Sequence, residues 1–358
     1  MFFEKNAQRL ADFARISQTA GARADYVQGG GGNTSVKFPD GLMAIKASGF
    51  CLKDIRPDKA YAVLDGAAIR DFYLTSEPSQ FENVETAGSA KAKESIQTNE
   101  GLDALRPSVE AGFHSILKTF VVHTHSIYAN LATCACNCKE LAEKAFAGAD
   151  YSWGWVDYTD PGANLTFAIR DELKRVEAAT GKVPSIILMQ NHGIIAHDDD
   201  PDKVLAYHAD ANERIAALYG LTGSSFPKVE IKQVEEGLYE NATPYLTKAM
   251  ASGRYTENFL LEQPLYPDQM VFLIGSFSMD KDTVEEGQCV AYSDGRVLMR
   301  MDEKKAQVFA ETLTAVVYII DAIEKAGNPL STMGEAAKHF IANWESEKYR
   351  KSLAGKKG

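Results

Sequence analysis

The chain has 358 residues, of which 45% are hydrophobic and 24% are charged, and both shares are typical of a folded globular protein. The length suits two domains of ordinary size, and the composition excludes a disordered or fibrous protein. A formal net charge of −11 argues against a nucleic-acid-binding protein, because neutralising phosphates requires clustered lysine and arginine.

The N-terminal part of the sequence predicts one helix followed by strands. Apolar residues repeat at helical spacing over residues 4–20, and the helix ends at a glycine. The glycine-rich stretch 29–38 then changes to a period of two, and residues 42–47 form the returning strand after a Pro-Asp-Gly turn. A further strand is predicted at 60–66, and the polar residues 76–105 are predicted to be a long loop.

The middle of the sequence predicts alternating helices and strands. Strands are expected at 120–126 and as two runs within 185–200, on either side of Asn191-His192-Gly193. The expected helices cover residues 108–120, 126–134, 139–147, 164–178 and 201–219.

A change of composition within residues 221–237 predicts a domain boundary, because glycine, serine and proline give way there to charged residues. It divides the chain into residues 1–225 and 226–358. In the second part we expect a strand at 269–275, a hairpin at 289–301 with Asp294-Gly295 at its turn, and helices at 303–325 and 332–347. This C-terminal α+β region contains no motif that indicates a catalytic or binding function.

Three histidines are candidate metal ligands. His123 and His125 are two residues apart on a predicted strand, so both imidazoles leave the same face. His192 lies at a strand end, and Gly193 beside it allows an unusual backbone turn. Three neutral imidazoles with one open position are typical of a catalytic zinc. The alternative for all seven histidines is a local hydrogen bond, which is our expectation for the remaining four: His114, His197, His208 and His339.

Glu110 is a candidate general base, since it begins a helix that would pack beside the His123 strand. We expect partial burial to raise its pKa. The alternative is an ordinary glutamate at a helix N-terminus, with Ser108 as the cap. His114 lies one helical turn after Glu110 and is a candidate hydrogen-bond partner of the site.

The glycine-rich stretch does not fit a dinucleotide-binding fingerprint, because a strand follows it where a helix is required. One interpretation is a nest of backbone N–H groups that binds an anion such as phosphate. The other is a flexible turn. The anion site would comprise Gly32, Asn33, Ser48, Gly49 and Ser108, with charge added by Lys37 and Lys46.

We expect neither a leader peptide nor a membrane-spanning segment. The first residues carry charge in every turn, and no run approaches the roughly 18 consecutive apolar residues of a membrane span. Three of the five cysteines crowd into residues 134–138, where free buried thiols explain them better than a metal cluster. We expect a cytoplasmic protein with neither a membrane nor a nucleic-acid partner.

The motifs GGGGNTSVK, KASG, RPSVE, HTHS and QNHG occur in that order, and residues 1 to about 220 thereby resemble the class II aldolase/adducin family. They are most similar to the aldolase half of bifunctional rhamnulose-phosphate aldolase/short-chain dehydrogenase proteins. The resemblance implies an α/β fold, an α/β/α sandwich with a mostly antiparallel central sheet. It also implies a homotetramer with active sites between subunits.

The resemblance further implies that the three histidines bind Zn²⁺ or another divalent metal, with Glu110 as acid/base. It assigns Gly32, Asn33, Ser48, Gly49 and Ser108 to a substrate phosphate. Val109 stands where sugar-phosphate aldolases have a second serine, so one phosphate contact is missing. Pentose-phosphate 4-epimerases carry aspartate at the position of Glu110, and the glutamate here favours a lyase.

The expected function is therefore a metal-dependent carbon–carbon lyase that cleaves a small-molecule sugar or sugar phosphate, such as a ketose phosphate, through a zinc-stabilised enediolate. Decarboxylation of a 3-keto sugar acid and 4-epimerisation are the neighbouring alternatives. A zinc hydrolase and a non-enzymatic, adducin-like scaffold are the alternatives from other classes.

Overall fold

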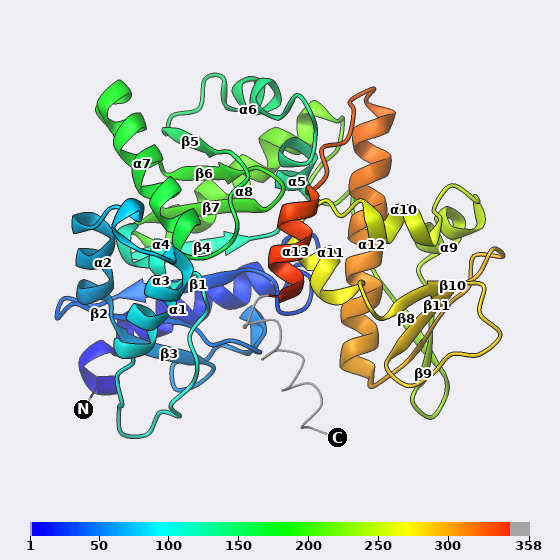
Figure 1. Cartoon of the computed structure of the whole chain (residues 1–358), viewed down its shortest axis with the longest axis horizontal. Coiled ribbons are helices and arrows are strands. Elements are labelled where there is room, and N and C mark those ends of the chain that lie inside the picture. Colours follow the sequence, from blue (N-terminus) through cyan, green and yellow to red (C-terminus); the bar gives the residue numbers. More distant parts are fainter. Residues whose placement is uncertain (1, 344–358) are drawn as a thin grey trace.

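A computed structural model describes residues 2–343. Its strands form two β-sheets, and helices surround both sheets. The first sheet lies in the N-terminal two thirds of the chain and the second in the C-terminal third (Figure 1). The last predicted helix begins as α13 (Glu335–Asn343), and its remaining residues lie outside the described part of the chain.

The larger sheet has seven strands, and every neighbouring pair is antiparallel except β5 with β6. This confirms the expected mostly antiparallel sheet. Its strands, in spatial order, are β3 (Tyr61–Asp65), β2 (Leu42–Lys46), β1 (Asn33–Lys37), β4 (Phe120–Thr124), β7 (Gly193–Asp198), β6 (Ile186–Met189) and β5 (Trp153–Val156). Thr124 pairs with Ile194, so the end of β4 lies beside the start of β7.

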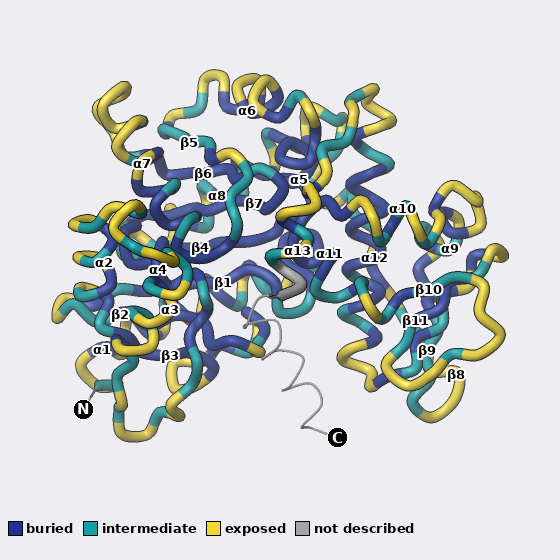
Figure 2. The backbone as a smooth tube through the Cα atoms, viewed as in Figure 1, coloured by how far each residue is buried: buried dark blue, intermediate teal, exposed yellow. Residues whose placement is uncertain are grey.

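Helices cover both faces of this sheet, because its strands are apolar on both sides. In β2, Met43 and Ile45 belong to one buried cluster while Ala44 belongs to the other. One face packs against α1 (Phe2–Gly21), α5 (Ile127–Thr133), α6 (Cys138–Phe146) and α8 (Pro201–Leu218). The other packs against α2 (Gly66–Thr75), α3 (Val84–Glu94), α4 (Ala111–Ile116) and α7 (Ala163–Thr180). The result is the expected α/β/α sandwich, and its strands run through the most buried part of the molecule (Figure 2).

The C-terminal region has a smaller, five-stranded sheet of its own. Its spatial order is β10 (Phe277–Met279), β11 (Gln288–Ala291), β12 (Val297–Arg300), β9 (Leu238–Asn241) and β8 (Ile231–Glu235). The antiparallel pairing of β11 with β12 confirms the predicted hairpin. The helices of this region before α13 are α9 (Pro244–Ala251), α10 (Glu257–Glu262), α11 (Pro267–Phe272) and α12 (Glu303–Lys325).

Helix α12 stands between the two sheets and joins the two parts of the chain (Figure 1). It packs on α5 of the N-terminal part and on α9 and α11 of the C-terminal region, and one hydrophobic cluster runs from Leu10 to Ile323. The division at residue 225 therefore stays a prediction. Among the described residues α12 alone is long and apolar enough to cross a membrane, but 72% of its most apolar window is buried here, as in the core helix of a globular protein.

Three sequence predictions differ from the structure. Residues 269–275 were expected to form a strand, but residues 269–272 lie in α11. This helix begins at Pro267, because Pro267 and Asp268 supply a helix start that outweighs the β-propensity of the apolar residues. The expected loop 76–105 contains α3, whose N-cap is Asn83 and which buries only Gly88, so its sequence has no apolar stripe. Cys136 is exposed in the turn between α5 and α6, whereas the other four cysteines are buried.

Candidate metal centre

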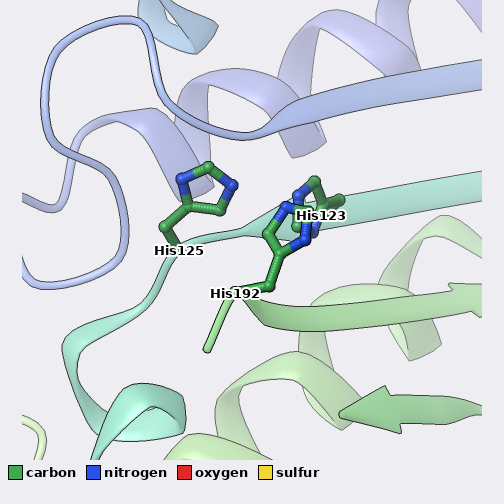
Figure 3. Close-up of side chains that lie close together, drawn as sticks. All are labelled: His123, His125 and His192. Atoms are coloured by element: carbon green, nitrogen blue, oxygen red, sulfur yellow. The ribbon is translucent and has the colours of Figure 1, made fainter. Parts of the chain in front are cut away.

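The antiparallel pairing of β4 with β7 brings the three candidate histidines together. His123 is the fourth residue of β4, His125 follows one residue beyond its end, and His192 occupies the turn between β6 and β7. Figure 3 shows the three imidazoles converging on one space from these two neighbouring segments. The prediction that both residues of the HTH motif lie on one strand holds for His123 only, since β4 ends at Thr124.

The cluster is compact and buried. One ligand nitrogen from each of the three histidines lies within 4.8 Å of the other two. The side chains are almost fully buried, with residue exposures of 0%, 7% and 2% for His123, His125 and His192. Gly193 has φ of +159°, and a Cβ there would lie 2.3 Å from the Thr124 carbonyl oxygen. Only glycine therefore lets the His192 turn approach β4 so closely.

The hydrogen bonds of two imidazoles leave their Nε2 atoms as metal-binding nitrogens. His123 donates from Nδ1 to the Ile194 carbonyl at 3.0 Å, and His125 donates from Nδ1 to Asp268 Oδ2 at 2.7 Å. Each Nε2 then carries the lone pair. Among the residues that the structure describes, none hydrogen-bonds the buried Nε2 of His123, and a bound cation would occupy the lone pair of this nitrogen. Burial lowers the pKa of His123 to about 3, so this imidazole has the neutral form that binds metals. The donor set thus fits a divalent transition metal.

Glu110 lies against two of the three histidines. Its Oε1 is 3.3 Å from His192 Nε2, and its Oε2 is 3.6 Å from His123 Nε2. It occupies the N-cap position of α4 but makes no capping hydrogen bond with its side chain. Burial raises the pKa of Glu110, but the interactions with His123, His192 and His125 outweigh this, so the pKa lies well below 4.5. The expectation of a raised pKa was therefore wrong.

A polar network holds Glu110 from the side of β1. The side-chain amide of Asn33 donates to Glu110 Oε2 at 2.6 Å and to Ser108 Oγ at 3.1 Å. The Asn33 carbonyl oxygen accepts from His114 Nε2, and His114 Nδ1 lies 2.7 Å from Ser35 Oγ. Burial lowers the pKa of His114 and keeps this ring neutral. His114 therefore contacts the site through Asn33.

Several predicted anion-binding residues lie near this network. Gly32 has φ of +63°, and a Cβ there would lie 2.5 Å from the His123 carbonyl oxygen, so the glycine stretch runs directly beside β4. Ala47 bridges to Pro107, and the Ser48 amide donates to the Arg106 carbonyl at 2.9 Å. Residues 47–49 therefore run beside Ser108.

The two lysines that were predicted to add charge to the anion site, Lys46 and Lys37, both bind main-chain carbonyls. The Lys46 ammonium donates to the carbonyls of Phe50 at 2.8 Å and Gly30 at 3.2 Å, and so ties the glycine stretch to β2. Lys37 is the last residue of β1, at the end away from Asn33, and its ammonium donates to the Lys118 carbonyl at 2.7 Å. Burial lowers the pKa of Lys37 to about 7. The structure does not bring Lys37 to the centre.

The contact that sequence reasoning missed is the one between Asp268 and His125. Asp268 comes from the C-terminal region, in which we found no chemical motif. An aspartate directly after a proline is also what an ordinary helix start contains, so the local sequence carries no signal of a metal centre.

Comparisons with known proteins cover the N-terminal part of the chain. Residues 11–219 match the family described as class II aldolase and adducin N-terminal domain. No curated protein matches the chain. Among solved structures, the N-terminal class II aldolase domain of a conserved protein from Thermoplasma acidophilum is 21% identical, with a TM-score of 0.46, and the match covers 57% of this chain and 90% of that one.

Two further solved structures are similar over the same part. The L-fuculose-1-phosphate aldolase from Thermus thermophilus is 15% identical with a TM-score of 0.38, covering 60% of this chain and 94% of that one. The sugar-phosphate aldolase from Thermotoga maritima is 15% identical with a TM-score of 0.39, covering 59% and 95%.

Proposed function

The chain belongs to the class II aldolase and adducin family, and on that premise we propose that it is a metal-dependent carbon–carbon lyase acting on a ketose phosphate or a related sugar derivative. The observation that carries the proposal is the contact of the Glu110 carboxylate with His123 and His192 inside the cluster of three histidines. A buried carboxylate beside a metal site is the arrangement needed to move a proton at a carbon next to a metal-polarised carbonyl.

His123, His125 and His192 would hold the metal, for which we propose zinc, because a catalytic zinc site typically has three protein ligands and imidazole is one of its usual ligands. When bound, zinc supplies a Lewis acid that withdraws electron density from the substrate carbonyl. The partner atoms of His123 and His125, the Ile194 carbonyl and Asp268, fix the orientation of these two rings.

Glu110 transfers the proton at the carbon next to the substrate carbonyl. When the carbon–carbon bond breaks, its electron pair passes to the carbon next to the carbonyl, while the hydroxyl on the other carbon loses its proton and becomes the aldehyde. The carbon next to the carbonyl then takes up one proton in place of the one that the hydroxyl lost. The low pKa of Glu110 keeps it ionised at neutral pH, so in the direction of condensation it removes this proton as a base. Asn33 holds Oε2, which leaves the buried Oε1 for proton transfer.

The experiment that tests the proposal is a substrate screen with purified, zinc-loaded protein. Ketose phosphates including pentose phosphates, unphosphorylated ketoses, 3-keto sugar acids and simple esters are incubated with zinc-loaded and with metal-stripped protein, and released aldehyde, carbon dioxide, epimeric sugar phosphate and free acid are measured. We expect aldehyde release that depends on the metal. Carbon dioxide release would identify a decarboxylase, and interconversion of pentose phosphates an epimerase. Hydrolysis of esters without carbonyl release, or a complete absence of metal binding, would contradict the proposal.

We further propose a homotetramer in the cytoplasm. The five cysteines are free thiols, which suits a reducing compartment. Light scattering of the purified protein measures the subunit number, and a stable monomer would contradict the tetramer.

A further inference from the structure

The C-terminal region reaches the candidate metal centre through the first turn of α11. Asp268 Oδ2 lies 2.7 Å from Nδ1 of His125, although the two residues are 143 positions apart in the sequence. The aspartate is 1% exposed. The glycine stretch closes the other side, because a Cβ on Gly31 would lie 2.3 Å from the same carboxylate oxygen.

The chemistry of this contact differs from that of the other fixed imidazole. His123 donates to a neutral main-chain carbonyl, whereas His125 donates to a buried carboxylate. A carboxylate that accepts the Nδ1 proton fixes the ring orientation and the tautomer, and it makes Nε2 a stronger donor to a metal. A buried carboxylate costs free energy unless it is paired, and the Nδ1–H of His125 supplies that pairing for Asp268.

The surrounding residues hold Asp268 in place. Gln269, the next residue, accepts from the Leu265 amide at 2.8 Å and donates to the Leu260 carbonyl at 2.7 Å, which fastens the start of α11 to the preceding segment. Tyr266 is fully buried, and its ring packs edge-on against His125 with centroids 6.4 Å apart. The hydrogen bonds of Gln269 and the packing of Tyr266 therefore hold the start of α11, and with it the Asp268 carboxylate, in place.

The same region also fixes the backbone beside a second ligand. Asn191, which precedes His192, has a left-handed φ of +51°. Its side-chain amide donates to the carbonyls of Leu265 and Ser331, each at 2.8 Å, and its carbonyl oxygen accepts from the Ser331 hydroxyl at 3.0 Å. Both the nitrogen and the oxygen of the Asn191 side-chain amide thus bind residues of the C-terminal region.

We propose that Asp268 is a positioning residue of the metal centre, which orients His125 for metal binding, and that the C-terminal region is thereby a part of the catalytic unit. The inference rests on the proposed function in one respect, namely that the three histidines bind a metal. It assigns a role to a region that the family match, ending at residue 219, does not include.

The test is metal binding by the full-length protein, which needs no substrate. Wild type, Asp268→Asn, Asp268→Ala and Asp268→Glu are stripped of metal and titrated with Zn²⁺ against a chromophoric chelator, and with Co²⁺ while the visible spectrum is recorded. The control is Asp282→Asn, which removes an exposed carboxylate from the same region. We expect Asp268→Ala to weaken Zn²⁺ binding about 10- to 100-fold and to alter the Co²⁺ spectrum. Asp268→Glu should recover part of the affinity, and the control should match the wild type.

Asp268→Asn decides the outcome if the alanine variant does not fold, because asparagine keeps the shape and an acceptor but removes the charge. It should bind Zn²⁺ more weakly than the wild type while its metal-free circular dichroism is unchanged. Wild-type affinity and an unchanged Co²⁺ spectrum in folded Asp268→Asn or Asp268→Ala would overturn the inference and leave the proposed function standing. Absence of metal binding by the wild type would overturn both.

Discussion

Asn33 donates both hydrogens of its side-chain amide within the protein, one to Glu110 Oε2 at 2.6 Å and one to Ser108 Oγ at 3.1 Å. Its carbonyl oxygen accepts from His114, so every polar atom of the side chain has a partner. A substrate phosphate could bind this amide only by displacing Glu110 or Ser108. The geometry therefore favours Asn33 as a residue that holds the general base, rather than as the phosphate contact that the family resemblance implies.

Replacing Asn33 by alanine separates the two roles. If the side chain holds Glu110, kcat should fall on the order of tenfold or more, because a misplaced base loses much of its catalytic effect, and KM should change little. Steady-state kinetics with a phosphorylated and an unphosphorylated substrate make the measurement. A rise in KM for the phosphorylated substrate alone, with kcat unchanged, would instead establish the phosphate contact.

Replacing Glu110 by glutamine should remove proton transfer while leaving the metal bound. Glutamine keeps the size of the side chain and can still lie between His123 and His192, but it cannot act as a base. We expect exchange of the substrate proton next to the carbonyl to fall by about 10²- to 10⁴-fold. Proton NMR in deuterated water follows the exchange, and metal analysis serves as the control. Exchange at the wild-type rate would eliminate Glu110 as the acid/base.

The sequence predicted the candidate metal centre well where the signal was local. His123 and His125 stand out because a spacing of two on a strand has a direct geometric meaning, and Asn191-His192-Gly193 interrupts two apolar strand runs. To predict that these two segments lie side by side, one must know the order of the strands in the sheet. The hydrophobic period does not give this order, since any of the predicted strands could have paired with β4. The resemblance of ordered motifs supplied that missing information.

The contribution of the C-terminal region was not predictable in the same way. Asp268 acquires its role only because the first turn of α11 lies beside His125, and no sequence pattern reports a contact between residues 143 positions apart. The sequence also predicted a strand at residues 269–275, because the apolar residues there have high β-propensity, and the short helix α11 was therefore missed. For the Glu110 pKa, burial was recognised, but the compensating imidazoles depend on distances that only the fold provides.

Removing either His123 or His192 should abolish stoichiometric metal binding. Glutamine at either position leaves two imidazoles, and a catalytic zinc site held by protein normally needs three ligands. Metal analysis after gentle purification, together with Zn²⁺ titration of the stripped protein, measures the loss. His339→Gln is the matched control, because that histidine is exposed on α13. Full metal content in His192→Gln would exclude it from the metal site.

His197 gives a pH dependence that is separate from the metal centre. It lies in β7 near the end away from His192, its side chain is fully buried, and its Nδ1 accepts from the Lys118 amide at 3.3 Å. Burial lowers the pKa of His197 from 6.5 to about 3. Between these two values the unfolded chain binds one more proton than the folded chain, so the free energy of unfolding falls as the pH falls through this range.

Replacing His197 by asparagine should remove this dependence, because the asparagine carbonyl oxygen can accept from the Lys118 amide but does not titrate. The free energy of unfolding of the variant minus that of the wild type should increase by on the order of 2–3 kcal/mol as the pH falls from about 7 to about 4, and this difference should stay constant above about pH 7. Urea unfolding of metal-stripped protein measures it, since metal release then makes no contribution. Parallel pH profiles for wild type and variant would mean that His197 is protonated in the folded state as readily as in the unfolded chain, and burial would not be the dominant influence on this ring.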